Sequence, residues 1–177
     1  GKQDQFCAVY GGVNIIIFKD YVQVFQQLPS FIEPLLPYLI LFHTGIIRKS
    51  RKIQEGFKNL NKEQIKALNK MKNICLKGIT AINEGNIKKV GKLLDKTWEM
   101  KKKSNKGVSN KKIDKIYQKG KDCGALGGKI MGAGGGGHIL FICPPEKQGE
   151  LKKVMTKMGC KWVDFSIDWN GLETRII

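Results

Sequence analysis

The first third of the chain carries short apolar runs of the kind that form strands. β-Branched residues dominate positions 14–18, and positions 38–42 are continuously apolar. Both patterns predict strands. Apolar and polar side chains alternate over residues 21–25, which predicts a second strand or an extension of the first. Three prolines between residues 29 and 37 argue against a helix in that stretch.

Beyond residue 46 the apolar positions recur at spacings of three and four, which is typical of amphipathic helices. The predicted helices cover residues 65–82, 87–98, 113–126 and 146–158. The predicted strands in this part cover residues 139–143, 162–167 and 172–177. Residues 101–110 are polar and predict an exposed turn. Helices that alternate with single strands favour an α+β fold, with the helices on one face of a small, mostly antiparallel sheet.

A glycine-rich segment directly precedes the apolar run at residues 139–143. It consists of Gly132, Ala133, Gly134, Gly135, Gly136 and Gly137. Glycine loses much conformational freedom on folding, so such a cluster indicates positive φ angles or a close backbone approach. Successive backbone N–H groups can also form an anion-binding nest. A mobile linker is the alternative, and the strand that follows at once argues against it.

The net charge of +17 is concentrated in one region of the 177-residue chain. Residues 48–121 hold 23 Lys/Arg against 6 Asp/Glu, and the remaining residues balance at 9 and 9. The excess is nearly all lysine, and few aromatic residues are interleaved with it, which does not favour nucleic-acid binding. A lysine-rich solvated helical face is the preferred interpretation, and attraction of anionic substrates is a second one.

Cysteine and histidine usage limits the chemistry further. The five cysteines form no CxxC pair, so neither a disulfide framework nor a structural zinc site is expected. Reduced and mostly buried thiols are expected instead. His43 and His138 are the only imidazoles, and no metal site is predicted. No apolar run approaches the length needed to cross a bilayer and no signal core is visible, so a cytoplasmic location is the default expectation.

Three segments together resemble the GHMP small-molecule kinases in type and order. They are residues 1–6 (GKQDQF), 43–48 (HTGIIR) and 129–137 (KIMGAGGGG). This superfamily includes galactokinases, homoserine kinases, mevalonate kinases and phosphomevalonate kinases. The GKQDQ start, the YGGVN segment at 10–14 and the Thr-Gly-x-x-Arg step are most similar to D-glycero-D-manno-heptose 7-phosphate kinases.

The resemblance implies a function and a set of site residues. The implied reaction is ATP-dependent phosphorylation of the anomeric hydroxyl of a heptose 7-phosphate. Asp4 takes the place of the catalytic base, and Thr44, Gly45 and Arg48 are the implied substrate-binding residues. The implied role of the glycine loop, residues 132–137, is to shape the phosphate loop and the substrate pocket.

The resemblance also implies a division of the chain. Residues 1–37 would end an N-terminal kinase domain, and residues 38–177 would form the ferredoxin-like C-terminal domain. The loop Pro-x-x-x-Gly-Leu-Gly-Ser-Ser-Ala, with which these kinases bind ATP phosphates, does not occur in the sequence. ATP and Mg²⁺ are therefore expected to bind mainly to residues outside this sequence. We predict that this polypeptide alone transfers phosphate inefficiently.

Two other functional hypotheses remain open at this point. The first is a different GHMP kinase of the fucose or mevalonate type, with an unphosphorylated acceptor. The second is a non-catalytic ferredoxin-like module that binds an anionic ligand, RNA or a partner domain. The region 139–143 offers only Phe141 as an aromatic stacking residue, which weakens the RNA hypothesis. The sequence leaves the oligomeric state open.

Overall fold

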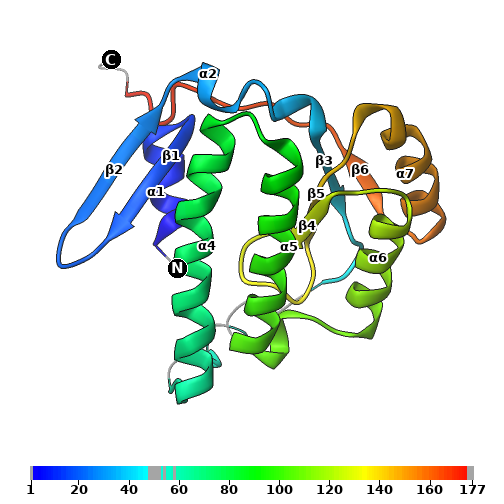
Figure 1. Cartoon of the computed structure of the whole chain (residues 1–177), viewed down its shortest axis with the longest axis horizontal. Helices are drawn as coiled ribbons and strands as arrows, with labels where there is room; N and C mark the ends of the chain where they lie inside the picture. The colour runs from blue at the N-terminus through cyan, green and yellow to red at the C-terminus, as the bar shows by residue number, and fades with distance from the viewer. Residues whose placement is uncertain (1, 48–52, 54, 58, 175–177) are drawn as a thin grey trace. The chain divides into compact units, whose positions relative to one another are not determined.

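The computed structural model describes residues 2–47, 53, 55–57 and 59–174 (Figure 1). The chain divides into two compact units. The first comprises the described residues of Gly1–Leu36 and Phe165–Ile177, and the second comprises those of Pro37–Asp164.

The first unit combines a helix with a β-hairpin. Its elements are α1 (Gln3–Tyr10), β1 (Val13–Phe18), β2 (Val22–Gln27) and the short α2 (Pro29–Ile32). β1 and β2 pair antiparallel, with Ile15 opposite Phe25, so the alternating segment is a strand of its own. The expectation of no helix near the prolines is wrong for α2. Pro29 occupies the first turn of α2, where a proline removes no helical hydrogen bond.

The C-terminal segment packs against the loop that follows α1. The backbone N–H of Leu172 donates to the carbonyl of Val9 at 3.0 Å, and that of Gly12 donates to Asp168 at 2.6 Å. Gly11 has a φ of 63°, and a Cβ on it would lie 2.4 Å from the backbone nitrogen of Gly171. Residues 172–174 are not in a strand, so the predicted edge strand is wrong for them. The rest of that predicted strand, 175–177, lies outside the described residues.

The second unit is built on a four-stranded antiparallel sheet with the strand order β4-β5-β3-β6. The strands are β3 (Leu39–His43), β4 (Gly127–Ile130), β5 (His138–Ile142) and β6 (Lys161–Val163). The sheet confirms the predicted α+β class. β4 was not predicted, because its first two residues are glycines. β6 is shorter than the predicted strand at 162–167.

The helices of the second unit agree with the apolar spacing. They are α4 (Lys62–Asn83), α5 (Ile87–Ser104), α6 (Lys111–Asp122) and α7 (Pro145–Lys157), with 3₁₀ turns η1 (Leu36–Tyr38), which begins in the first unit, and η2 (Lys106–Val108). The predicted exposed turn at 101–110 is wrong. α5 continues to Ser104, and Val108 is fully buried. Lysines in the last turn of α5 suit the negative end of the helix dipole.

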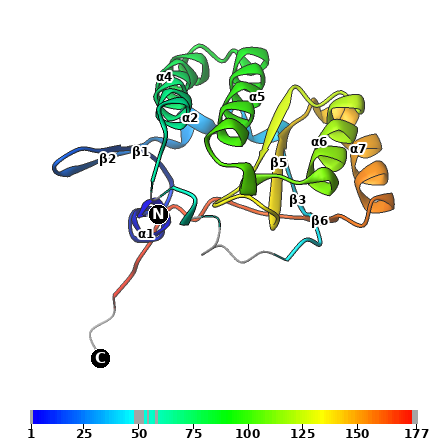
Figure 2. The same ribbon diagram turned by 90° about the horizontal axis from the view of Figure 1, so that it is seen from below.

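One apolar core lies on one face of this sheet. Phe42 and Phe141 are fully buried there, with ring centroids 6.5 Å apart in an edge-to-face arrangement. α5, α6 and α7 add Trp98, Ile116 and Leu151 to the same cluster. α6 and α7 lie together on one side of β3 and β5 (Figure 2). Successive side chains of a strand point to opposite faces of the sheet, so the residues next to the core residues in each strand lie on the other face.

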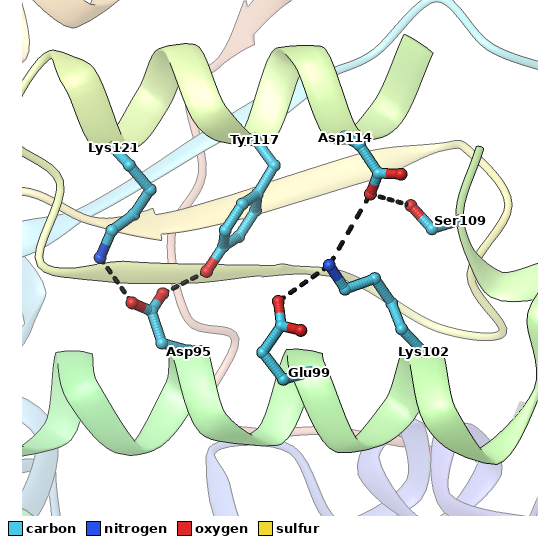
Figure 3. A network of polar contacts seen from close by, with 7 residues as sticks. All are labelled: Asp95, Glu99, Lys102, Ser109, Asp114, Tyr117 and Lys121. Carbon is cyan, nitrogen blue, oxygen red and sulfur yellow. Dashed lines mark hydrogen bonds and ion pairs between the residues drawn. The ribbon is translucent and has the colours of Figure 1, made fainter. Parts of the chain in front are cut away.

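Polar contacts connect α5 to α6 (Figure 3). Asp95 accepts a hydrogen bond from the Tyr117 hydroxyl and forms an ion pair with Lys121, whose Nζ lies 2.6 Å from Oδ2. Lys102 lies 2.8 Å from Glu99 of its own helix and 3.9 Å from Asp114 of α6. Burial raises the pKa of Tyr117, and the hydrogen bond to the Asp95 carboxylate raises it further.

This raised pKa predicts a stability change at alkaline pH. The folded protein holds the Tyr117 proton more tightly than the unfolded chain does. Its contribution is therefore fully present below the unfolded pKa of about 10, and it is lost as the pH rises above that value. Tyr117→Phe is expected to remove this part of the pH dependence, as measured by urea unfolding across that range. The exposed Tyr21→Phe is the matched control, and equal alkaline slopes for the two variants would contradict the expectation.

Candidate functional site

The glycine loop connects β4 to β5 and has the backbone that its composition predicts. Positive φ angles occur at Gly132 (65°), Gly134 (103°), Gly135 (75°), Gly136 (147°) and Gly137 (78°). L-residues with side chains rarely adopt such angles. The glycines are therefore required by the path of the chain.

The loop is packed against its neighbours. A Cβ on Gly134 would lie 2.6 Å from the Cβ of Val108, and one on Gly136 would lie 2.4 Å from the carbonyl oxygen of Ile46. The N–H of Gly135 donates to Val108 at 2.7 Å, and the N–H of Gly137 donates to Ile46 at 3.1 Å. These contacts exclude the mobile-linker interpretation. An anion-binding nest would present the backbone N–H groups of this loop to a ligand. Two of these groups, those of Gly135 and Gly137, already donate hydrogen bonds within the protein.

Thr44, which directly follows β3, forms hydrogen bonds to this loop. Thr44 is only 1% exposed, and its Oγ1 donates to the carbonyl of Gly137 at 2.8 Å. Its backbone N–H donates to the same carbonyl at 2.8 Å, and Oγ1 accepts from the N–H of Ile46 at 3.3 Å. Gly45 follows with a φ of 69°. The structure thus brings Thr44 and Gly45 to the glycine loop, and direct substrate contact by them stays a prediction.

Two lysines lie beside the loop. Lys101 of α5 donates from Nζ to the carbonyl of Gly132. Lys129 lies on β4, and burial lowers its pKa. The sequence gives no signal for Lys101, which is one lysine among many. Val108 was also missed, although it is a single apolar residue in a polar stretch and marks a buried position.

Asp4 lies in the first unit, in the first turn of α1, and its side chain is exposed. The positive end of the helix dipole favours a carboxylate there. On the same helix the rings of Phe6 and Tyr10 stack with centroids 6.4 Å apart. Arg48, the predicted phosphate or sugar contact, lies outside the described residues.

The lysines of α4 and α5 surround a hollow between these two helices. The hollow has a volume of about 510 Å³ and is lined by Lys66, Lys70 and Lys103, with Ala67 and Met100 among its apolar residues. Lys66 and Lys70 are exposed. Much of the positive charge therefore lies on a solvated helical surface, where it adds to the field around the protein.

The remaining titratable groups form few clusters. Within the described part of the chain, no group of three or more His, Cys, Asp or Glu side chains is arranged to hold a metal ion. Cys123, Cys143 and Cys160 are buried and Cys7 and Cys75 are exposed, all as free thiols. Burial raises the pKa of Cys143 to about 11. Of the helices described, none is both long and apolar enough to cross a membrane.

Residues 79–162, which include the glycine loop and most of the sheet, match the family GHMP kinases C terminal. The matched part of the chain is thus similar to the C-terminal domain of GHMP kinases, and the fold is the predicted α+β, ferredoxin-like one. The chain is 29% identical to the D-glycero-alpha-D-manno-heptose 7-phosphate kinase of Campylobacter jejuni over 98% of its own length and 53% of that protein.

Two further comparisons agree with this family. The L-fucokinase/L-fucose-1-P guanylyltransferase of Bacteroides fragilis is 29% identical over 98% of this chain and 20% of that protein. A crystal structure of a Campylobacter jejuni protein superposes with a TM-score of 0.69 at 29% identity, covering 97% of this chain and 50% of that one. The chain spans about half the length or less of the relatives that it matches.

Proposed function

We propose that this chain is the C-terminal part of an ATP-dependent sugar kinase that phosphorylates the anomeric hydroxyl of a heptose 7-phosphate. The similarity to the Campylobacter heptose 7-phosphate kinase, which extends over 98% of the chain, carries the proposal. The close packing of Thr44 and the glycine loop supports it, because a rigid loop suits a reaction that depends on positioning. In this proposal residues 1–37 belong to the N-terminal kinase domain and residues 38–177 to the C-terminal one.

The proposed roles follow from the chemistry of phosphoryl transfer. The attacking hydroxyl must be positioned and must lose a proton, and Asp4 is the proposed acceptor of that proton. Thr44 holds the glycine loop, which borders the acceptor in this proposal, and Thr44 and Gly45 are the proposed substrate-binding residues. Arg48 is the proposed contact to a phosphate or sugar oxygen, because a guanidinium recognises phosphate with paired hydrogen bonds.

ATP is the proposed phosphoryl donor and Mg²⁺ its proposed partner. The residues described here do not fit a magnesium site, because no three acidic or other ligating side chains converge. The amides of Gly135 and Gly137 are also already engaged within the protein. We therefore assign both groups mainly to residues outside this chain and derive no step through the metal. For the same reason we expect the 177-residue chain alone to release ADP much more slowly than the full reading frame that contains it.

The acceptor preference tests the proposal. With the full reading frame, we expect kcat/KM for a heptose 7-phosphate to exceed that for L-fucose at least about 100-fold. The sugar phosphate offers two or more charge-assisted hydrogen bonds that fucose lacks, each worth about 1.5–3 kcal/mol. The measurement is coupled ADP release with each acceptor.

The similarity to the Bacteroides fucokinase favours one second candidate, a fucose-type kinase. Turnover on fucose alone would replace the first candidate with this one. No turnover on any sugar would reject the kinase proposal and leave a binding module. The isolated chain, assayed in parallel, shows whether the upstream residues are required.

A further inference from the structure

Two imidazoles and a lysine lie side by side across three strands of the second unit. His43 of β3 is paired with His138 of β5 on one side and with Lys161 of β6 on the other. Paired residues of antiparallel strands project from the same face, with Cβ atoms about 5 Å apart. The rings of His43 and His138 lie edge to face, with centroids 5.0 Å apart. The three side chains therefore form one continuous row.

This row lies on the face of the sheet opposite the core. Phe42 and Ile139, the neighbours of the two histidines along their strands, are fully buried in the core, so the histidines point the other way. His138 and Lys161 are exposed and His43 is partly buried. The row also lies next to the glycine loop, because His138 directly follows Gly137.

The surroundings of the row favour an anion. The four strands of the sheet contain no Asp or Glu, and Lys129 of β4 projects from the same face. Among the residues that the structure describes, no carboxylate forms a hydrogen bond or ion pair with His43, His138 or Lys161. A lysine beside two imidazoles opposes the binding of a metal cation and favours a negative ligand.

The hydrogen bonding of His43 supports the same conclusion. Its Nδ1 accepts a hydrogen bond from the backbone N–H of Gly45 at 3.3 Å. In the neutral ring the proton is therefore on Nε2, which makes Nε2 a donor. A nitrogen that carries a proton donates to an anion, whereas a metal ion requires its lone pair. The ring is thus prepared for an acceptor ligand.

We propose that His43, His138 and Lys161 form a binding site for a phosphate dianion on this face of the sheet. A phosphate offers several acceptor oxygens, and the ammonium of Lys161 and the imidazole N–H groups supply the donors. The phosphate can belong to a sugar phosphate or to a nucleotide. Its assignment to the acceptor sugar rests on the proposed function, and the site itself does not.

The test uses the 177-residue chain and inorganic phosphate as the probe. The two histidine Cε1–H resonances are followed by NMR at neutral pH, with chloride at matched ionic strength as the reference, and His138→Gln assigns them. We expect both resonances to shift in a saturable manner. Lys161→Gln should weaken phosphate binding about tenfold, since one charge-assisted hydrogen bond is lost.

Lys153→Gln is the matched control, because it removes the same charge from an exposed position on α7. It should leave phosphate binding unchanged. Unmoved histidine resonances, or equal weakening by the two lysine substitutions, would overturn the site and show only the general positive field. The experiment needs no turnover, so a failed kinase assay does not decide it. A shift with ADP but none with heptose 7-phosphate would overturn the assignment to the sugar.

Discussion

Asp4→Asn is expected to lower kcat of the full reading frame by about 10²- to 10⁴-fold, the range that a general base contributes. The amide keeps the size of the side chain and cannot take the proton of the attacking hydroxyl. Asp4 is exposed in the first turn of α1, so the substitution should not disturb folding. Steady-state ADP release with a heptose 7-phosphate measures the effect, and far-UV circular dichroism checks the fold.

Asp20→Asn is the matched control for this substitution. Asp20 is an exposed carboxylate in the turn between β1 and β2, in the same unit of the chain. Its removal changes the net charge by the same amount, so kcat should stay within about twofold if only the overall field is affected. A full kcat in Asp4→Asn would remove Asp4 from the mechanism. An equal loss in both variants would assign the effect to charge.

The second large effect is expected for Gly136→Ala, which should lower the free energy of unfolding by about 3 kcal/mol. Alanine is strained at the φ of 147° that this residue adopts. Its Cβ would also lie 2.4 Å from the carbonyl oxygen of Ile46, which the backbone holds in place. The loop must shift to relieve both, and its bond to Ile46 through Gly137 is then lost. Urea unfolding of the isolated chain measures the change.

Gly78→Ala provides the control for a glycine without such constraints. Gly78 lies inside α4, and apart from the backbone of its own helix nothing lies within 4 Å of the position that its Cβ would take. Alanine is the better helix former, so this variant should gain about 0.5–1 kcal/mol. If Gly136→Ala were as stable as the wild type, the loop would have to be less tightly packed than the structure indicates.

Local sequence patterns predict much of this fold. The spacing of apolar residues predicts the helices α4 to α7 because each buries one face, and Asn61 and Asn110 accept hydrogen bonds from the first turns of α4 and α6. Continuous apolar runs predict β3 and β5, since both strands contribute to the core. The glycine-rich composition predicts a loop with positive φ angles, because residues with side chains rarely adopt such angles.

The features that sequence patterns did not predict depend on contacts between residues that are far apart in the sequence. β4 begins with Gly127, where an added Cβ would lie 1.9 Å from the carbonyl oxygen of Gly91. Close packing against α5 therefore selects glycine at a strand position, and no alternation is visible. Val108 is buried by distant residues that no local window contains. The row of His43, His138 and Lys161 is likewise created by strand pairing between segments far apart in sequence.

The roles of the candidate site residues stay predictions, and the structure adds how some of them are arranged. The sequence indicated Thr44, Gly45 and the glycine loop, and the structure adds that Thr44 holds Gly137 through two hydrogen bonds. The sequence suggested an anion-binding nest, yet two of its amides donate within the protein. Hydrogen bonds of this kind depend on tertiary contacts between β3, η2 and the loop, which residue types alone do not specify.

The position of the transferred phosphate tests the account most directly. The full reading frame is incubated with ATP and a heptose 7-phosphate, and the product is examined by ³¹P NMR. The account predicts one new phosphate ester per ADP released, with its phosphorus coupled to the anomeric proton of the sugar. ADP release without a new ester, or an ester on any other carbon, would contradict it.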